Sequence, residues 1–291
     1  MKKINRMLDF YVYDVFTDRP FTGNPLAVVM GADALGTTQM QAIARQFNLS
    51  ETIFVMAPRQ PGHSARVRIF LPLAEIPFAG HPTVGCALHL GGADGDLVLE
   101  EEAGPVPVSI AGGLAEFMAP VLPRAGRPVD PGDAARGLGL SPAQVGFGAH
   151  RPMVVSGGSD FIFVPLSDVA ALEAARPAGG DFDSLTRDVA KVYCYAAEGS
   201  DLRARMFAPA NGIPEDPATG SAAAALSAPL LAAGALSEGE TRLDLRQGIE
   251  MGRPSRIGLR VTVRGGKLAQ VHVSGRAVRV AEGRIRIPEE P

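Results

Sequence analysis

Two short stretches of the sequence combine chemically active side chains with the start of a small-residue helix. Ala79–Leu88 contains His81, and Glu215–Leu226 contains Asp216 and Ser221. In each stretch a glycine-containing turn leads into an alanine-containing segment that is typical of a helix start. The first amides of a helix have no partners within the helix and lie at the positive end of its dipole, so both stretches predict a helix end that attracts anions.

These residues could perform acid/base chemistry on a bound carboxylate. The amides that follow Gly80 and Gly220 could hold the carboxylate, and each helix dipole would contribute about 0.3–1 kcal/mol at an exposed site. Holding the carboxylate between two donors makes the neighbouring carbon more acidic. Glu51, which lies where a loop enters a predicted strand, could move that proton with His81 and Asp216, for about 10²–10⁴ in rate. Such a reaction requires no redox cofactor.

Each side chain also has an ordinary structural explanation. Glu51 could be a solvated loop carboxylate, and Asp216 could be a helix cap or a turn former. His81 could be a structural histidine, and Ser221 a hydroxyl in a first helical turn. Their convergence on two similar helix ends favours function for Asp216 and His81.

Other chemistries lack support in the sequence. No glycine pattern of the dinucleotide-binding or P-loop type occurs. The histidines lack the spacing of metal ligands, so neither a metal nor a cofactor is expected; they stand at positions 63, 81, 89, 150 and 272. A hydrolase triad of Ser221, His81 and Asp216 is conceivable, but Thr219–Ala223 lacks the second glycine of a nucleophile elbow.

A repeat of similar residues precedes the two helix starts. Arg68–Pro72 and Arg205–Pro209 share arginine, phenylalanine and proline at matching positions, 137 residues apart, and the threonines that follow, Thr83 and Thr219, are 136 apart. The pattern indicates an internal duplication. Each half would then be a sheet around one central helix, and we expect the two helix N-termini to face each other across a cleft.

The expected domains follow from this repeat. The proline- and glycine-rich stretch Ala119–Pro128 is interpreted as a linker, which divides the chain into residues 1–120 and 121–279. The C-terminal strand, 280–291, is a candidate addition to the first half. Within the second half, Pro229 predicts a kink or an early end of the helix, because proline lacks an N–H and clashes with the preceding turn.

The composition excludes several classes of protein. The chain has 291 residues, of which 46% are hydrophobic, and a net charge of −3 with interspersed charges, which argues against a nucleic-acid partner. No signal-peptide block and no membrane-length apolar run occur, so we expect a cytoplasmic protein without membrane contact. The two cysteines, Cys86 and Cys194, give neither a disulfide framework nor a metal site.

Five motifs together resemble one known family. They are Phe21–Pro25, Asn48–Thr52, Gly80–Thr83, Glu215–Ala222, and Gln247–Gly248 followed by Gly252–Ser255. As a set they are similar to the PhzF family of phenazine-biosynthesis-like isomerases, which shares the fold of diaminopimelate epimerase. The resemblance implies an α+β fold of two pseudo-symmetric halves, each a mixed sheet or barrel around a central helix, with the active site between them and commonly a homodimer.

The resemblance also implies roles for single residues. Glu51 matches the family's acid/base glutamate, and Gly80, His81, Asp216 and Ser221 match other active-site positions. Two further residues within the motifs, Asn24 and Gly220, are expected to bind the substrate with Gly80 and Ser221. The family reaction moves a proton between carbons of a cyclic carboxylated diene, and its best-known substrate is trans-2,3-dihydro-3-hydroxyanthranilate.

Two alternatives stay open. Epimerases and racemases of the same fold use two opposed thiols, whereas here Gly80 and Asp216 stand in those places and Cys86 lies further along its helix. An epimerase or racemase that uses a carboxylate instead is the first alternative, and a small-carboxylate binder without catalysis is the second.

Overall fold

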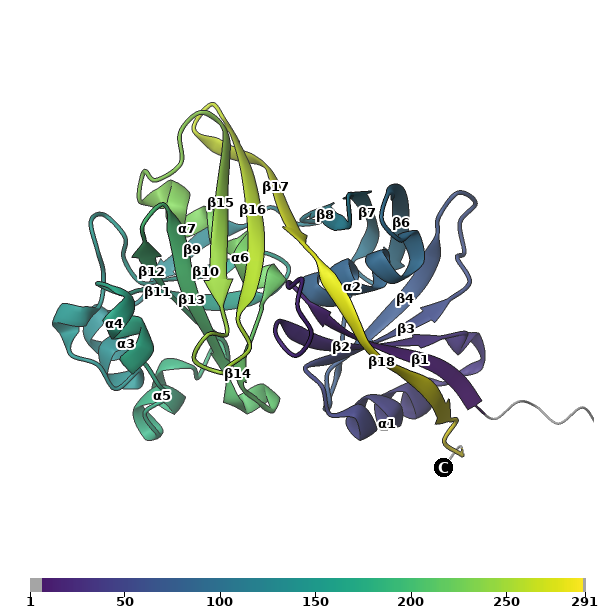
Figure 1. Ribbon diagram of the computed structural model, residues 1–291. Helices are drawn as coiled ribbons and strands as arrows, with labels where there is room; N and C mark the ends of the chain where they lie inside the picture. The colour runs from purple at the N-terminus through teal and green to yellow at the C-terminus, as the bar shows by residue number, and fades with distance from the viewer. Residues whose placement is uncertain (1–6, 290–291) are drawn as a thin grey trace, which may run out of the picture. The chain divides into compact units, whose positions relative to one another are not determined.

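The computed structural model describes residues 7–289 and divides them into two compact units. Unit 1 runs to Phe117 and includes the C-terminal segment from Ser274, and unit 2 comprises Met118–Val273 (Figure 1). Residues 1–6 and 290–291, which belong to the predicted first half and its C-terminal strand, lie outside the described residues. Within residues 7–289, no helix is long and apolar enough to cross a membrane.

Unit 1 is a mixed sheet in the order β18–β1–β2–β3–β4–β6–β7–β8. The pairs β2–β3 and β4–β6 are parallel, and the other neighbours are antiparallel. The short strand β5 pairs with β4. Its strands are β1 (Met7–Val15), β2 (Asn24–Met30), β3 (Glu51–Met56), β4 (Ala65–Phe70), β5 (Glu75–Ile76), β6 (Gly95–Glu101), β7 (Gly104–Ala111), β8 (Leu114–Met118) and β18 (Ala277–Arg286).

Two helices cover the two sides of this sheet. Helix α2 (Gly80–Gly91) packs against β1, β2, β3, β6 and β7, and its first eight residues are buried. A Cβ at Gly85 would lie 2.5 Å from a methyl group of Leu26, so glycine allows α2 to approach β2 closely. Helix α1 (Thr37–Phe47) packs on the opposite side, where Phe54 and Phe70 lie in its core. A short 3-10 turn, η1 (Ala32–Ala34), precedes α1.

Unit 2 repeats the same arrangement in the order β9–β10–β11–β12–β13–β15–β16. Again the third and fifth pairs, β11–β12 and β13–β15, are parallel and the others antiparallel, and a short strand, β14, pairs with β13. Its strands are β9 (Arg124–Pro128), β10 (Met153–Ser156), β11 (Asp160–Pro165), β12 (Val192–Glu198), β13 (Asp201–Ala208), β14 (Ile213–Asp216), β15 (Gly239–Gln247), β16 (Ser255–Arg264) and β17 (Lys267–Gly275).

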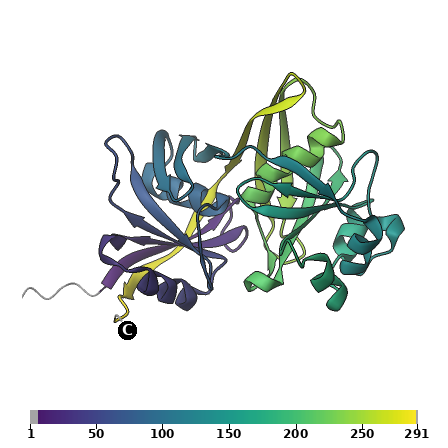
Figure 2. The ribbon, with the colours of Figure 1, turned by 180° about the vertical axis from the view of Figure 1, so that it is seen from behind.

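The helices of unit 2 also lie on two sides of its sheet. Three helices share a core with Val192, Cys194 and Phe207 on one side; they are α3 (Pro131–Gly137), α4 (Val169–Ala174) and α5 (Gly180–Leu185). On the other side, α6 packs against β16 and α7 against β9 and β10 (Figure 2). Helices α6 (Gly220–Ala225) and α7 (Ser227–Ala232) are separated at one residue; two 3-10 turns, η2 (Pro142–Gln144) and η3 (Pro209–Asn211), complete the unit.

The break between α6 and α7 confirms the expected interruption of the central helix. Pro229 is buried in the first turn of α7 and has no N–H to donate to the carbonyl of Ala225. The helix therefore ends and restarts at Leu226.

The matching strand orders confirm the predicted α+β fold of two similar halves. The repeated segments also have the same side-chain contacts. Arg68 donates from Nε and Nη2 to the carboxylate of Glu75 at 2.6 Å each, and Arg205 donates in the same way to Glu215 at 2.8 and 2.9 Å. Each guanidinium lies over the ring of the phenylalanine two residues later, at 5.2 and 4.9 Å. The shared letters therefore mark one ion-pair arrangement that occurs twice.

The structure corrects the register of this repeat. The central helices begin at Gly80 and Gly220, which are 140 residues apart, so these glycines are equivalent, whereas Thr83 and Thr219 are not. The helix starts are thus three residues further apart than the arginines, which are 137 residues apart. These three extra residues are those of η3, which has no counterpart between β4 and β5.

The predicted linker is partly a strand. Arg124–Pro128 forms β9, which pairs with β10 inside unit 2. All five residues of β9 are exposed, so the segment lacks the alternation of apolar and polar residues by which a strand is predicted.

Candidate functional site

The structure brings three of the predicted residues of unit 1 together. Glu51 is the first residue of β3, Asn24 is the first residue of β2, and His81 is the second residue of α2. His81 Nδ1 lies 3.3 Å from Glu51 Oε2 and 3.4 Å from Asn24 Nδ2. Asn24 and His81 are buried, and 12% of the Glu51 side chain is exposed.

Burial keeps the His81 imidazole neutral. It lowers the pKa of His81 to about 3, and a hydrogen bond to the backbone carbonyl of Pro25 only partly opposes this effect. Nε2 of His81 makes no hydrogen bond to any residue among 7–289, so Nδ1 is the nitrogen that donates to Pro25. Nε2 then keeps its lone pair and can accept a proton or a hydrogen bond. At neutral pH the contact with Glu51 is therefore not an ion pair.

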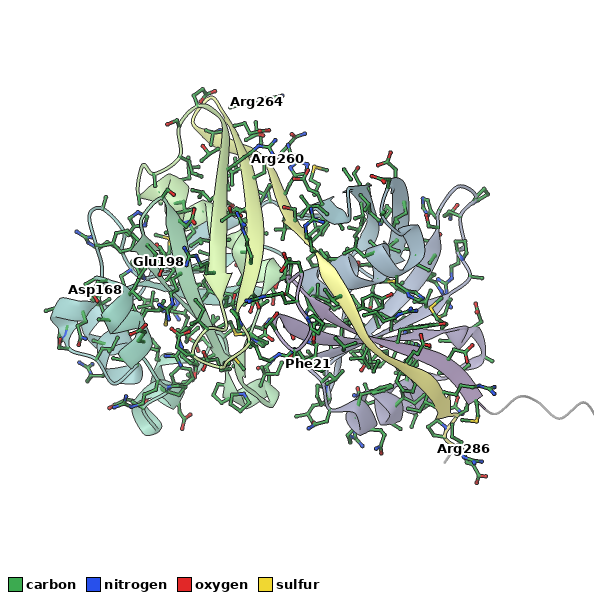
Figure 3. The ribbon with its side chains drawn as sticks, in the orientation of Figure 1. Phe21, Asp168, Glu198, Arg260, Arg264 and Arg286 are labelled. Carbon is green, nitrogen blue, oxygen red and sulfur yellow. The ribbon has the colours of Figure 1, made fainter. Side chains whose placement is uncertain are left out.

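The loop between β1 and β2 determines where Asn24 lies. The Asp14 carboxylate accepts a hydrogen bond of 2.6 Å from the Phe21 amide. Gly23 has φ of +69°, and a Cβ there would lie 2.4 Å from the Val15 carbonyl oxygen, so only glycine fits the turn. The Phe21 ring is 75% exposed on this loop (Figure 3).

A buried carboxyl group supports the first turn of α2. Thr83 Oγ1 lies 2.8 Å from the Ala79 carbonyl oxygen and 2.6 Å from Glu101 Oε1. Burial raises the pKa of Glu101 to about 8. Because a carbonyl can only accept, the threonine hydroxyl donates to Ala79 and the protonated Glu101 donates to the threonine. The start of α2 is thus held by neutral groups.

In unit 2 the motif around Asp216 is held by a buried glutamine. Asp216 ends β14, is buried, and accepts a hydrogen bond of 2.6 Å from Thr219 Oγ1. Gln247 Nε2 donates to the Asp216 carbonyl at 2.8 Å and to Thr219 Oγ1 at 2.9 Å. Gln247 Oε1 accepts from the Thr219 amide at 3.2 Å and from the Tyr193 hydroxyl at 3.3 Å. The Asp216 carboxylate therefore has a fixed position.

Gly220 and Ser221 follow directly. Gly220 is the first residue of α6 and is buried, and Ser221 is the second and is partly buried. Because Gly220 is equivalent to Gly80, Ser221 occupies in unit 2 the place that His81 has in unit 1. Asp216 corresponds in the same register to Ile76, so the two halves differ in chemistry at these positions.

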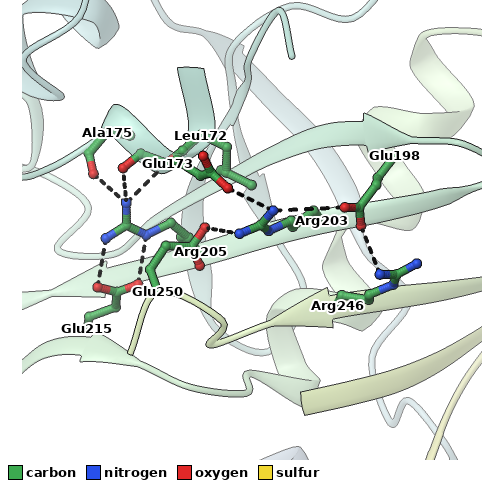
Figure 4. A network of polar contacts seen from close by, with 9 residues as sticks. All are labelled: Leu172, Glu173, Ala175, Glu198, Arg203, Arg205, Glu215, Arg246 and Glu250. Atoms are coloured by element: carbon green, nitrogen blue, oxygen red, sulfur yellow. Dashed lines mark hydrogen bonds and ion pairs between the residues drawn. The ribbon is translucent and has the colours of Figure 1, made fainter. Parts of the chain in front are cut away.

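A network of arginines and glutamates fixes the segments on both sides of the Asp216 motif (Figure 4). Arg205 binds Glu215 and also donates to three backbone carbonyls around α4. Arg203 binds Glu250, which lies in the turn after Gln247, at 2.9 Å, and Glu173 at 3.1 Å. Both arginines are on β13, so this strand holds β14 and the turn in place.

The turn itself contacts the motif through the backbone. Gly248 has φ of +76°, and a Cβ there would lie 2.5 Å from the Arg253 carbonyl oxygen and 2.6 Å from that of Pro217. Ser255 Oγ donates to the same Pro217 carbonyl at 2.8 Å. The last sequence motif, Gln247–Ser255, therefore supports the Glu215–Ser221 motif.

The structure thus places the predicted residues in two clusters, each at the start of its unit's central helix. Asn24, Glu51, Gly80 and His81 lie together in unit 1; Asp216, Gly220 and Ser221 lie together in unit 2. Sequence reasoning did not assign a role to Gln247 or Thr219, although both lie within recognised motifs. Their polar contacts join positions far apart in the chain, which a local pattern does not reveal.

Thiol chemistry has no support at these helix starts. Cys86 and Cys194 are fully buried, and burial raises the pKa of both thiols far above the ordinary value. A thiolate, the reactive form, is thus strongly disfavoured at both positions. Among residues 7–289 no group of three histidine, cysteine, aspartate or glutamate side chains is arranged to hold a metal ion.

Known proteins similar to this chain agree with the resemblance found in the motifs. The profile of the PhzC-PhzF family, described as phenazine biosynthesis-like protein, matches residues 13–283. An uncharacterized isomerase of Mesorhizobium japonicum is 42% identical, with 96% of this chain and 99% of that protein covered. A trans-2,3-dihydro-3-hydroxyanthranilate isomerase of Pseudomonas aeruginosa is 40% identical, with 94% and 98% covered.

Solved structures show the same fold. A phenazine biosynthesis protein of the PhzF family from Bacillus anthracis superposes with a TM-score of 0.85 at 27% identity, over 97% of this chain and 99% of that one. A hydroxyproline epimerase from Agrobacterium vitis, at 14% identity and a TM-score of 0.65 over 98% and 94%, shares the fold alone. The chain therefore belongs to the PhzC-PhzF family of phenazine biosynthesis-like proteins, and it is an isomerase of that family.

Proposed function

We propose that the protein is a cofactor-independent isomerase that moves a proton between two carbons of a small, cyclic carboxylate, with Glu51 as the acid/base group. The observation that carries the proposal is the contact of 3.3 Å between the Glu51 carboxylate and a buried, neutral His81 at the start of α2. Glutamate is a common general base in enzymes, and the neutral imidazole of His81 adds no positive charge beside it.

The proposed reaction is balanced without a co-reactant. Glu51 takes a proton from one carbon of the substrate, the electron pair shifts along the double bonds, and the protonated Glu51 returns the proton to another carbon. His81 lies beside the carboxylate, and the lone pair of its Nε2 can accept a hydrogen bond from the substrate. The resulting product has the same atoms as the substrate, as an isomerase requires.

We assign the residues of unit 2 to substrate binding. Ser221 and the Gly220 amide would hold an anionic group, and Asp216, fixed by Thr219, would orient the reacting ring. Asn24 and Gly80 would complete the set in unit 1. The homodimer and the cytoplasmic location expected from the sequence remain predictions.

The first compound to test is trans-2,3-dihydro-3-hydroxyanthranilate, because relatives 36–40% identical are named as its isomerases. The compound would be incubated with enzyme in heavy water and followed by NMR. The Glu51→Gln variant keeps the shape and removes the basic oxygen, so we expect at least about a 100-fold loss of turnover. Glu102→Gln, an exposed change in the same unit, is the control.

The outcome of this experiment separates the alternatives. Unchanged turnover in Glu51→Gln would eliminate the assigned role. Deuterium at a stereocentre with inversion, and no shift of a double bond, would indicate an epimerase or racemase. Saturable binding without any exchange of hydrogen would indicate a carboxylate-binding protein.

A further inference from the structure

The first turn of α2, which carries His81, closes through a long backbone hydrogen bond. The N-cap residue of the helix is Ala79, whose side chain makes no capping hydrogen bond. Its carbonyl accepts the first backbone hydrogen bond of the helix, from the Thr83 amide, at 3.3 Å. This bond alone is a weak closure, because N–H···O hydrogen bonds are normally nearer 2.9 Å. The position of His81 therefore depends on additional contacts.

The equivalent turn of unit 2 closes more tightly. By the equivalence of the two helix starts, Ala79 and Thr83 correspond to Thr219 and Ala223. The Ala223 amide donates to the Thr219 carbonyl at 2.9 Å. In unit 1 the Thr83 hydroxyl supplies what the long amide bond lacks, because it donates to the same Ala79 carbonyl at 2.8 Å. A side chain thus supports the turn of unit 1.

Glu101 determines the direction in which the Thr83 hydroxyl donates. The residue ends β6, only 7% of it is exposed, and its Oε1 lies 2.6 Å from Thr83 Oγ1. Burial raises the pKa of Glu101 to about 8, so the carboxyl group is mostly protonated at neutral pH. The carboxyl then donates to the hydroxyl, and the hydroxyl donates to the Ala79 carbonyl. Two protons serve two acceptors.

Ionisation of Glu101 would leave one proton for two acceptors. The carboxylate and the Ala79 carbonyl would then both need the Thr83 hydroxyl, at 2.6 and 2.8 Å. The hydrogen bond to the carboxylate is the stronger of the two, because its acceptor is charged. The hydroxyl should therefore turn towards Glu101 and release the carbonyl. Only the long amide bond would then close the first turn of α2.

The groups around Glu101 leave this ionisation to burial and to Thr83. Burial raises the pKa of Glu101, and the contact with Thr83 lowers it. The titratable residues of α2 are His81, Cys86 and His89, and burial favours the uncharged form of each. The adjacent strand β7 contains no ionisable residue. Three arginines and three glutamates, which balance in charge, line a surface cavity together with Glu101; they are Arg59, Arg66, Arg68, Glu75, Glu100 and Glu102.

We infer that Glu101 is a positioning residue that acts through the Thr83 hydroxyl to hold the first turn of α2, and with it His81, in the arrangement that the reaction needs. The inference rests on the proposed function and adds a residue from outside the sequence motifs. It also gives the enzyme an upper pH limit, because the turn loosens when the carboxyl group ionises. Every group involved belongs to unit 1.

The first test observes His81 without any turnover. In protein with isotope-labelled histidine, NMR would record the rings of the five histidines, and the signal missing from His81→Asn would identify His81. We expect the wild-type His81 signal to shift with a midpoint of about pH 8, where Glu101 ionises, although His81 itself stays neutral there. Glu101→Gln can donate to Thr83 at every pH and should abolish the shift.

Further variants test the path of the effect. Thr83→Ser keeps the hydroxyl and should keep the shift. Thr83→Val keeps the shape and removes the hydroxyl, so its His81 signal should be displaced already at neutral pH. Glu102→Gln, an exposed change beside Glu101, should behave like the wild type. In variants that circular dichroism shows to be folded, a shift that persists in Glu101→Gln would overturn the inference, as would its absence from the wild type.

Kinetics connect this positioning to the reaction. With trans-2,3-dihydro-3-hydroxyanthranilate as substrate, Thr83→Val should lower kcat about tenfold or more with little change in KM, because a small misplacement of His81 disturbs the reacting geometry. Glu101→Gln should match the wild type at neutral pH and keep its activity above about pH 8, where the wild type loses it. Equal pH profiles for the two proteins would contradict the inference.

The two measurements separate this inference from the proposed function. A protein whose His81 signal follows Glu101, but which converts no substrate and exchanges no hydrogen, would refute the proposed reaction alone. An active isomerase whose His81 signal does not depend on Glu101 would refute the positioning role alone.

Discussion

At the scale of single residues, burial decides which groups around α2 carry charge. It lowers the pKa of His81 to about 3 and raises that of Glu101 to about 8, so both groups are neutral near pH 7. The two groups give the stability of the fold opposite pH dependences. The neutral His81 stabilises the fold fully above its unfolded pKa of 6.5, and this contribution is lost as the pH falls towards 3.

Glu101 should make the protein less stable as the pH rises. Its pKa in the fold exceeds the unfolded value of 4.5, so the folded state holds a proton that the unfolded state releases. Stability should fall between pH 4.5 and 8, by up to about 1.4 kcal/mol per pH unit from this group. Glu101→Gln can still donate to Thr83 and should remove this dependence.

Urea unfolding at pH 5, 6.5 and 8 would measure the effect as the difference between variant and wild type. Glu102→Gln, which changes an exposed neighbour, should leave the pH dependence as it is. Equal slopes for wild type and Glu101→Gln would show that the buried carboxyl is ionised in the fold.

Individual site residues were predictable where they stand in a motif. His81 and Asp216 were predicted because each lies next to a glycine turn and a helix start. Glu51 was predicted because it stands in a motif that resembles a known family. Gln247 acts through contacts with residues 28 and 31 positions earlier, which depend on the parallel pairing of β13 with β15.

At the scale of elements, the turn after β15 controls the position of the Asp216 motif. Gly248 and Gly252 both have positive φ, at +76° and +69°, but they differ in surroundings. A Cβ at Gly248 would collide with two backbone carbonyls, whereas at Gly252 no atom lies within 4 Å. Alanine substitutions at the two glycines therefore distinguish the cost of backbone strain, present at both, from the cost of steric clash, present only at Gly248.

Gly248→Ala should cost more stability than Gly252→Ala. Both variants should lose about 1 kcal/mol from the positive φ, and Gly248→Ala should lose about 1–3 kcal/mol more because its surroundings are rigid backbone. The chain has no tryptophan, so circular dichroism in urea is the suitable measurement. Equal losses would mean that the turn moves freely and does not hold the motif.

Elements were predictable where hydrophobic periodicity or proline determines them. The break near Pro229 follows from the missing N–H of proline. The proline- and glycine-rich sequence around β9 favours a linker, and the strand could not be predicted because its residues are exposed and its partner β10 begins about 25 residues later. The spacing of 136 residues between Thr83 and Thr219 differs by four from the 140 residues between the helix starts, and three of these four residues are those of η3, an insertion in one copy that has no sequence signature.

At the scale of the whole molecule, the last strand of the chain belongs to the first unit. β18 pairs with β1 from Ala277 to Arg286, and Arg276 accepts hydrogen bonds from the amides of Phe16 and Thr17 through its carbonyl. Figure 1 shows β18 alongside β1. Without β18, β1 would become an edge with unpaired backbone groups.

A chain that ends after Gly275 should therefore lose the stability of unit 1 while unit 2 remains folded. We expect an early transition for unit 1 in thermal unfolding followed by circular dichroism. A chain that ends after Pro288 keeps β18 and the hydrogen bond from Gln39 to Pro288, and should unfold like the full chain. A single transition at the wild-type temperature in the shorter chain would contradict the prediction.

The position of β18 has a consequence for folding during synthesis. A ribosome completes every residue of unit 2 before it makes Ala277, although unit 1 begins the chain. Unit 1 must therefore keep an open edge on β1 until β18 has been made, and unit 2 can acquire its structure first. Unit 2 would then fold before unit 1 is complete. Chaperones that shield exposed strand edges would be needed longest by unit 1.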